Sequence, residues 1–169
     1  MQPDPWQCCS DTVVVTQTPP EGFGMPELDP AVHERIQALC AQGDALAEND
    51  RFPAALKKYW AAWDLLPEPR TAWEAATWIL GAIGDANFLG GDFAAGRDNL
   101  THAMHCPDAV GNPFLHLRLG QCLYELGELD RAADELTRAY TTGGAEVFED
   151  AEEYFAFLRT RLAPPAGGW

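Results

Sequence analysis

One spacing recurs three times in this sequence, and it limits the possible fold more than any other feature. Each copy has a glycine, a small residue twelve positions later, an aromatic residue or leucine four positions after that, and an alanine three further on. The copies are Gly43, Ala55, Tyr59 and Ala62; Gly84, Gly96, Leu100 and Ala103; and Gly120, Ala132, Leu136 and Ala139. Small residues at matched places let two helices approach closely. The spacing therefore predicts a stack of similar helix pairs.

The charge balance restricts the partners of such a stack. Eleven Lys and Arg residues oppose 26 Asp and Glu residues, which gives a formal net charge of -15. A field of this sign repels phosphate backbones and anionic membranes and attracts basic proteins. Because 47% of the 169 residues are hydrophobic, enough apolar surface remains for one folded domain. The composition predicts only the class of partner: a basic protein, with no nucleic acid and no membrane.

The cysteines and the first residues indicate the compartment. The five cysteines are Cys8, Cys9, Cys40, Cys106 and Cys122, an odd number without the regular spacing of a disulfide framework. The amino-terminal residues lack the basic and apolar regions of a signal peptide, and no run of about eighteen apolar residues occurs. These features predict a cytoplasmic protein with free thiols at Cys8 and Cys9.

The residues that typically begin helices, together with the repeated spacing, predict an all-α solenoid of three helix pairs. Asp29 before Pro30 and Asn112 before Pro113 are typical helix starts, since the polar side chain caps amides and proline suits the first turn. The expected organisation is an irregular arm over 1–29 with an extended piece at 12–16, a helical domain over 30–162, and a flexible tail over 163–169. Within the domain we expect repeats at 36–69, 77–110 and 113–146 and a capping helix at 149–162.

The first two repeats are further apart than the last two. The glycines of the first pair of repeats are 41 positions apart, and those of the second pair 36. The surplus predicts a helix lengthened to run from about Arg70 to Leu89, projecting beyond its neighbours with Trp73 and Trp78. The alternative is that both tryptophans pack against the first repeat.

The segment LGQCLYELGELDRAADELTRAY, residues 119–140, resembles the tetratricopeptide family. The looser segments IGDANFLGGDFAAGRDNLTHAM and QGDALAENDRFPAALKKYWAAW are similar to it, and together they cover about two thirds of the chain. In that family the first helix of each pair lines a concave groove. The resemblance implies that the groove is lined by Gln37, Cys40, Asp44, Ala47, Glu48, Trp78, Gly81, Asp85, Phe88, Leu89, Phe114, Leu117, Gln121, Tyr124 and Glu125. Family members that grip a carboxylate tail use lysine, arginine and asparagine at such positions, and none stands there in this chain.

The predicted partner-binding residues combine acids with aromatic rings. They are Gln37, Asp44, Glu48, Trp73, Trp78, Asp85, Phe88, Phe114, Gln121, Tyr124 and Glu125. Acids and rings together suit a basic segment that carries apolar anchors. Self-association through the groove as a homodimer, and occupation of the groove by the chain's own arm, are alternatives left open by the sequence.

Two groups of small tetratricopeptide proteins look similar in size. One comprises bacterial immunity proteins that block a toxin domain, and the other comprises chaperones that hold a translocator segment for type III secretion. The resemblance favours a non-catalytic immunity protein, with the chaperone as the alternative.

A metal-dependent enzyme is a third hypothesis. His102, His105 and Cys106 form HxxHC, with Asp98 four residues before His102, but Cys106 is expected to point inward. We expect His116 to be a buried histidine with satisfied hydrogen bonds. The acids over 146–153 are typical of a solvated helix start, and no GxSxG, P-loop, HExxH or CxxC spacing occurs. We therefore predict no enzyme activity, no metal and no cofactor.

Overall fold

The computed structural model describes residues 27–163, and all regular structure in this range is helical. The helices are α1 (Pro30–Ala47), α2 (Phe52–Trp63), α3 (Glu74–Leu89), α4 (Phe93–Ala103), α5 (Pro113–Glu125), α6 (Leu129–Gly143) and α7 (Glu152–Arg161). Most of the expected arm, including Cys8, Cys9 and the extended piece at 12–16, lies outside the described residues. Residues 164–169 of the expected tail lie outside them as well.

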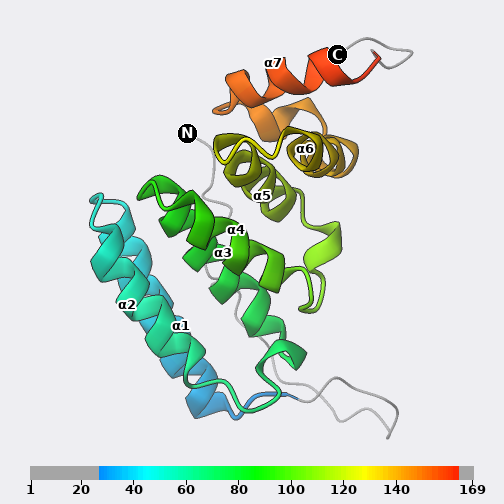
Figure 1. Cartoon of the computed structure of the whole chain (residues 1–169). Helices are drawn as coiled ribbons and strands as arrows, with labels where there is room; N and C mark the ends of the chain where they lie inside the picture. Colours follow the sequence, from blue (N-terminus) through cyan, green and yellow to red (C-terminus); the bar gives the residue numbers. More distant parts are fainter. Residues whose placement is uncertain (1–26, 164–169) are drawn as a thin grey trace, which may run out of the picture.

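The helices form three pairs that stack in chain order. Figure 1 shows α1 with α2, then α3 with α4, then α5 with α6, side by side, and α7 at the carboxyl end of the stack. The two helices of each pair contact each other, and α2 contacts α3 as α4 contacts α5. The predicted all-α solenoid of three pairs with a terminal helix is confirmed.

Two helix starts form as their sequences predict. The Asp29 carboxylate accepts hydrogen bonds from the amides of Ala31 and Val32 at 2.9 and 3.3 Å. Asn112 caps α5 in the same way through the amides that follow Pro113. A side-chain acceptor satisfies amides that have no partner within the helix, so both helix starts are fixed locally.

The repeated glycines hold the two helices of each pair together. Gly43 faces the ring of Tyr59, Gly84 faces Leu100, and Gly120 faces Leu136, each sixteen positions later on the second helix. These three glycines and the residues that they face are all buried. A Cβ at Gly120 would lie 2.7 Å from the Leu136 Cγ and 3.2 Å from its backbone nitrogen. The absence of a side chain at this position is therefore what lets the second helix approach.

The segment between α2 and α3 corrects one expectation. A helix from about Arg70 was expected, but α3 begins at Glu74, after a 3₁₀ turn at Arg70–Ala72. Trp73 has extended backbone, and its indole nitrogen donates to the Pro67 carbonyl at 2.7 Å. The surplus residues thus form a turn that folds back on the end of α2. Trp73 and Trp78 are half-buried against the apolar core.

The carboxyl end has its own apolar cluster. Phe148, in a 3₁₀ turn at Ala145–Phe148, is 2% exposed, and its ring stacks on Phe155 of α7 at 4.9 Å between centroids. Tyr154 and Leu158 of α7 are buried in the same cluster with Leu136 of α6. The expected terminal helix is present, and it begins at Glu152, three residues after the expected start at 149.

Filling one glycine position tests this packing. We expect Gly120→Val to lower the free energy of unfolding by about 1–3 kcal/mol, because the added methyl groups force Leu136 and its backbone apart. Gly111→Val is the matched control, since a Cβ there meets nothing within 4 Å, and we expect a change within about 0.5 kcal/mol. Urea unfolding measures both. Equal losses in the two variants would contradict the role given to Gly120.

Candidate partner-binding surface

The first helices of the pairs, followed by α7, line the inner side of the curved stack. The Tyr154 ring of α7 lies 5.3 Å from Tyr124 of α5 and also 6.4 Å from Phe88 of α3, measured between centroids. A ring from α7 reaches α3 past α5 only if these helices converge on one side. The predicted groove residues belong to α1, α3 and α5, apart from Glu48, which directly follows the last residue of α1.

The carboxyl end of this inner surface is covered by α7. The rings of Tyr154 and Phe157 both pack edge-on against Tyr124, with Phe157 at 5.0 Å. The Tyr154 hydroxyl donates to the Glu125 carboxylate at 2.7 Å. Burial and this carboxylate raise the pKa of Tyr154, which keeps the hydroxyl protonated as a donor. The predicted binding residues Tyr124 and Glu125 therefore face a helix of their own chain.

Arg118 of α5 fills the middle of the surface. Its Nη2 lies 2.6 Å from the Oδ1 of Asp85, and its Nη1 donates to Gln121 at 2.9 Å. The guanidinium carbon lies 4.5 Å from the centre of the Phe88 ring and 5.2 Å from that of Phe114. Four predicted binding residues are thus gathered around one arginine of the same chain.

An open hollow remains at the amino end, between α1 and α3. Its volume is about 190 Å³, and it is lined by Asp44, Ala47, Glu48, Tyr59, Ala82, Asp85 and Leu89. Leu89 is 48% exposed. The Tyr59 hydroxyl donates to Asp44 at 2.8 Å, and burial together with this carboxylate raises the pKa of Tyr59. The hollow therefore combines three carboxylates with apolar walls.

The remaining predicted residues lie outside the hollow. Gln37 is half-buried on α1, and Trp73 and Trp78 are half-buried against the core. The sequence interpretation did not include Arg118, Tyr154 or Phe157. No pattern in the sequence marks Arg118, because the equivalent positions of the other two repeats hold Ala41 and Ala82.

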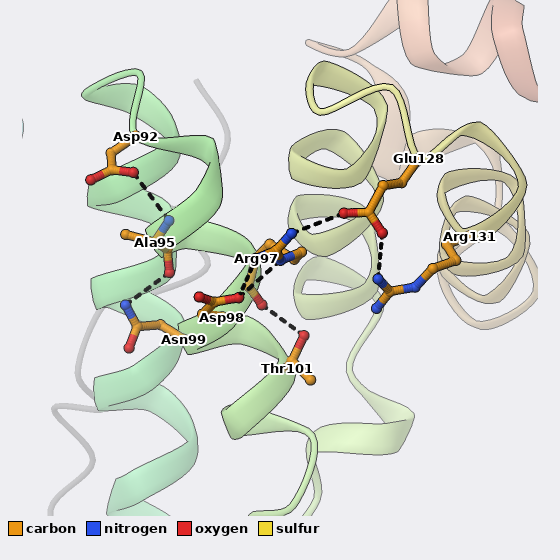
Figure 2. Close-up of polar contacts among 8 residues, drawn as sticks. All are labelled: Asp92, Ala95, Arg97, Asp98, Asn99, Thr101, Glu128 and Arg131. Carbon is orange, nitrogen blue, oxygen red and sulfur yellow. Dashed lines mark hydrogen bonds and ion pairs between the residues drawn. The ribbon is translucent and has the colours of Figure 1, made fainter.

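On the side of the second helices, acids are paired with arginines of their own chain. Figure 2 shows Arg97 of α4 between Asp98 and Glu128, with Arg131 on the other side of Glu128. Hydrogen bonds from Arg97 and Arg131 lower the pKa of Glu128. Arg97 thereby links the second pair to the third, although solvent screening makes the contribution of such an exposed pair to stability small. The acids of the hollow lie on a different side of the stack.

The residues of the HxxHC sequence do not form a metal-binding cluster in the described part of the chain. The His102 ring lies edge-on to Trp63 at 5.6 Å, and Cys106 is buried with its thiol 3.9 Å from the His102 carbonyl. Over residues 27–163, no three His, Cys, Asp or Glu side chains are placed to hold a metal ion. Within the same range, no helix is both long enough and apolar enough to span a bilayer.

His116 is buried with both ring nitrogens bonded, as expected. It is 3% exposed, with Nδ1 2.6 Å from Glu135 Oε2 and Nε2 2.8 Å from the Val110 carbonyl. Both partners are acceptors, so the ring is best satisfied when both nitrogens carry a proton. The bond to Glu135 accordingly raises the pKa of His116. The contact between His116 and Glu135 joins α5 to α6 and stabilises the packing of the third helix pair.

Comparison with known proteins agrees with the geometry. No family model matches the chain, and no curated protein matches its sequence. Among solved structures, the NMR structure of the first TPR domain of the human RPAP3 protein matches 76% of this chain and 95% of that chain. The TM-score is 0.60 and the sequence identity is 15%. The chain therefore has a tetratricopeptide-type fold.

The His116–Glu135 pair gives a pH-dependent contribution to stability. Because the folded-state pKa is raised, the contribution is fully present below the unfolded value of about 6.5 and is lost as pH rises through the folded value. We expect Glu135→Gln to destabilise the protein more at about pH 5.5 than at about pH 9. Urea unfolding across this range measures the difference, with Glu146→Gln as an exposed control. A loss for Glu135→Gln that is constant with pH would contradict the assignment.

Proposed function

We propose that this protein is a non-catalytic binding module that binds and neutralises a cognate basic protein, as a bacterial immunity protein inhibiting a toxin effector. The observation that carries the proposal is the acidic, apolar-walled hollow on the inner side of a tetratricopeptide-type stack. Stacks of this kind use their inner surface for recognition. A chain with a net charge of -15 selects a basic partner for that surface.

The hollow occupies only a short section of the inner surface, and this favours a folded partner. An extended segment lying along all three repeats would meet Arg118 in the middle and Tyr154 and Phe157 at the carboxyl end. A projecting loop or helix end of a folded domain needs only the hollow between α1 and α3. This arrangement supports an immunity protein over a chaperone that holds a long, unfolded segment.

The charge of the chain also suits the speed that neutralisation requires. Complementary charge raises the rate at which two proteins meet, and the effect falls as salt screens the field. Toxins that act on nucleic acids or nucleotides carry basic surfaces, because their substrates are anionic. An acidic inhibitor meets such a surface quickly and covers it.

Neutralising the acids of the hollow tests this function. The partner to use is a candidate basic toxin domain, measured for its binding to this protein and for the inhibition of its activity at equimolar ratio. We expect Asp44→Asn with Glu48→Gln to weaken binding by about tenfold at low salt, mainly through a slower association rate. The substitution Asp44→Asn keeps an acceptor for the Tyr59 hydroxyl, because an amide oxygen accepts the same hydrogen bond.

The matched control removes two charges elsewhere. Glu149→Gln with Asp150→Asn changes two exposed acids before α7 by the same total charge. Equal weakening by the two double variants would indicate a general field effect and would count against the hollow. Full affinity for an excised, unfolded peptide of the partner, without inhibition of the folded domain, would favour the chaperone alternative.

A further inference from the structure

The contact between the first and second repeats is called the first junction, and that between the second and third repeats the second junction. The two junctions differ at one matched pair of positions on the inner surface. At the second junction, Asp85 stands one position after its repeat glycine and pairs with Arg118, which stands two positions before the next. The same two places at the first junction hold Asp44 and Ala82. The carboxylate is thus kept, and the arginine is replaced by alanine.

The hollow of the first junction lies at the place that corresponds to the position of Arg118 in the second junction. Asp44 and Ala82 both line it. A second replacement enlarges the space: Phe88, which lies against the Arg118 guanidinium, has Ala47 as its counterpart four positions after Gly43. The resulting volume of about 190 Å³ is below the roughly 300–1,000 Å³ of sites for drug-sized ligands, and it suits one side chain.

We infer that the hollow binds a single arginine side chain presented by the partner protein. The guanidinium would pair with Asp44 as Arg118 pairs with Asp85, and its aliphatic stem would lie against Ala47, Ala82 and Leu89. The inference rests on the proposed function and specifies the residue that the partner contributes.

The chemistry of the lining selects arginine rather than lysine. Glu48 adds a second carboxylate beside Asp44, while Asp85 already pairs with Arg118, and a planar guanidinium with five donors can address two carboxylates at once. The arginine at the second junction shows that this backbone arrangement accommodates such a group beside an acid. The counterpart of Phe114 is Trp78, which is not part of the lining, so we expect no stacking of the guanidinium on a ring.

A capped arginine tests the site without the partner. The probe is N-acetyl-arginine N-methylamide, titrated into the ¹⁵N-labelled full chain and followed by NMR. We expect weak, saturable shifts of the amides of Asp44–Glu48 and Ala82–Leu89. The uncharged capped citrulline should leave these amides unchanged, and capped lysine should shift them less at equal concentration.

Two variants report on the same site. Ala82→Arg places an arginine in the chain at the position equivalent to Arg118, so it should abolish the response to the probe. Ala41→Arg, the matched control, adds the same charge at the equivalent exposed position of α1 and should leave the response intact. Asp44→Asn should weaken the response to the probe. This variant tests the site if circular dichroism shows that Ala82→Arg does not fold.

The outcomes separate this inference from the proposed function. An unchanged response in Asp44→Asn, an equal response to citrulline or lysine, or shifts spread over acids on other faces would overturn the arginine site. If Ala82→Arg binds the partner as well as wild type while Asp44→Asn with Glu48→Gln does not, this inference fails and the proposed function stands. A wild-type chain that takes up capped arginine but no partner would support the site and contradict the function.

Discussion

The contact between each repeat glycine and the side chain sixteen positions later determines how the rest of the molecule is arranged. Gly43, Gly84 and Gly120 have no Cβ, so Tyr59, Leu100 and Leu136 occupy the space directly over their backbones. The two helices of each pair are therefore close and similarly placed in all three repeats. This similarity makes the two junctions comparable position by position. A difference in side chains between them then becomes a difference in what the surface can bind.

The features predictable from the sequence are those that depend on local or periodic patterns. The helix pairs follow from the glycine spacing, and the starts of α1 and α5 follow from Asp29 and Asn112. The burial of His116 also follows from its place in the repeat. Each of these depends on residues within one helix or one pair, where spacing along the chain fixes distance in space.

The features not predicted depend on contacts between distant segments. The turn before α3 forms because Trp73 folds back on Pro67, which overrides the helical continuation expected from the count of surplus residues. The sequence did not indicate that Arg118 and α7 contact several of the predicted groove residues, among them Asp85 and Tyr124. Tertiary packing determines which part of the predicted groove remains open to a partner. In the structure that part is the hollow beside Asp44 and Ala82.

The first junction keeps the aspartate of the second junction but has alanine in place of its arginine. The proposed recognition of a partner depends on that difference. A crystal structure of the Ala82→Arg variant tests it most directly, because it needs neither partner nor ligand. We expect the introduced guanidinium to occupy the hollow and pair with Asp44, as Arg118 pairs with Asp85. A guanidinium turned to solvent, with the hollow still open beside Asp44, would contradict this account.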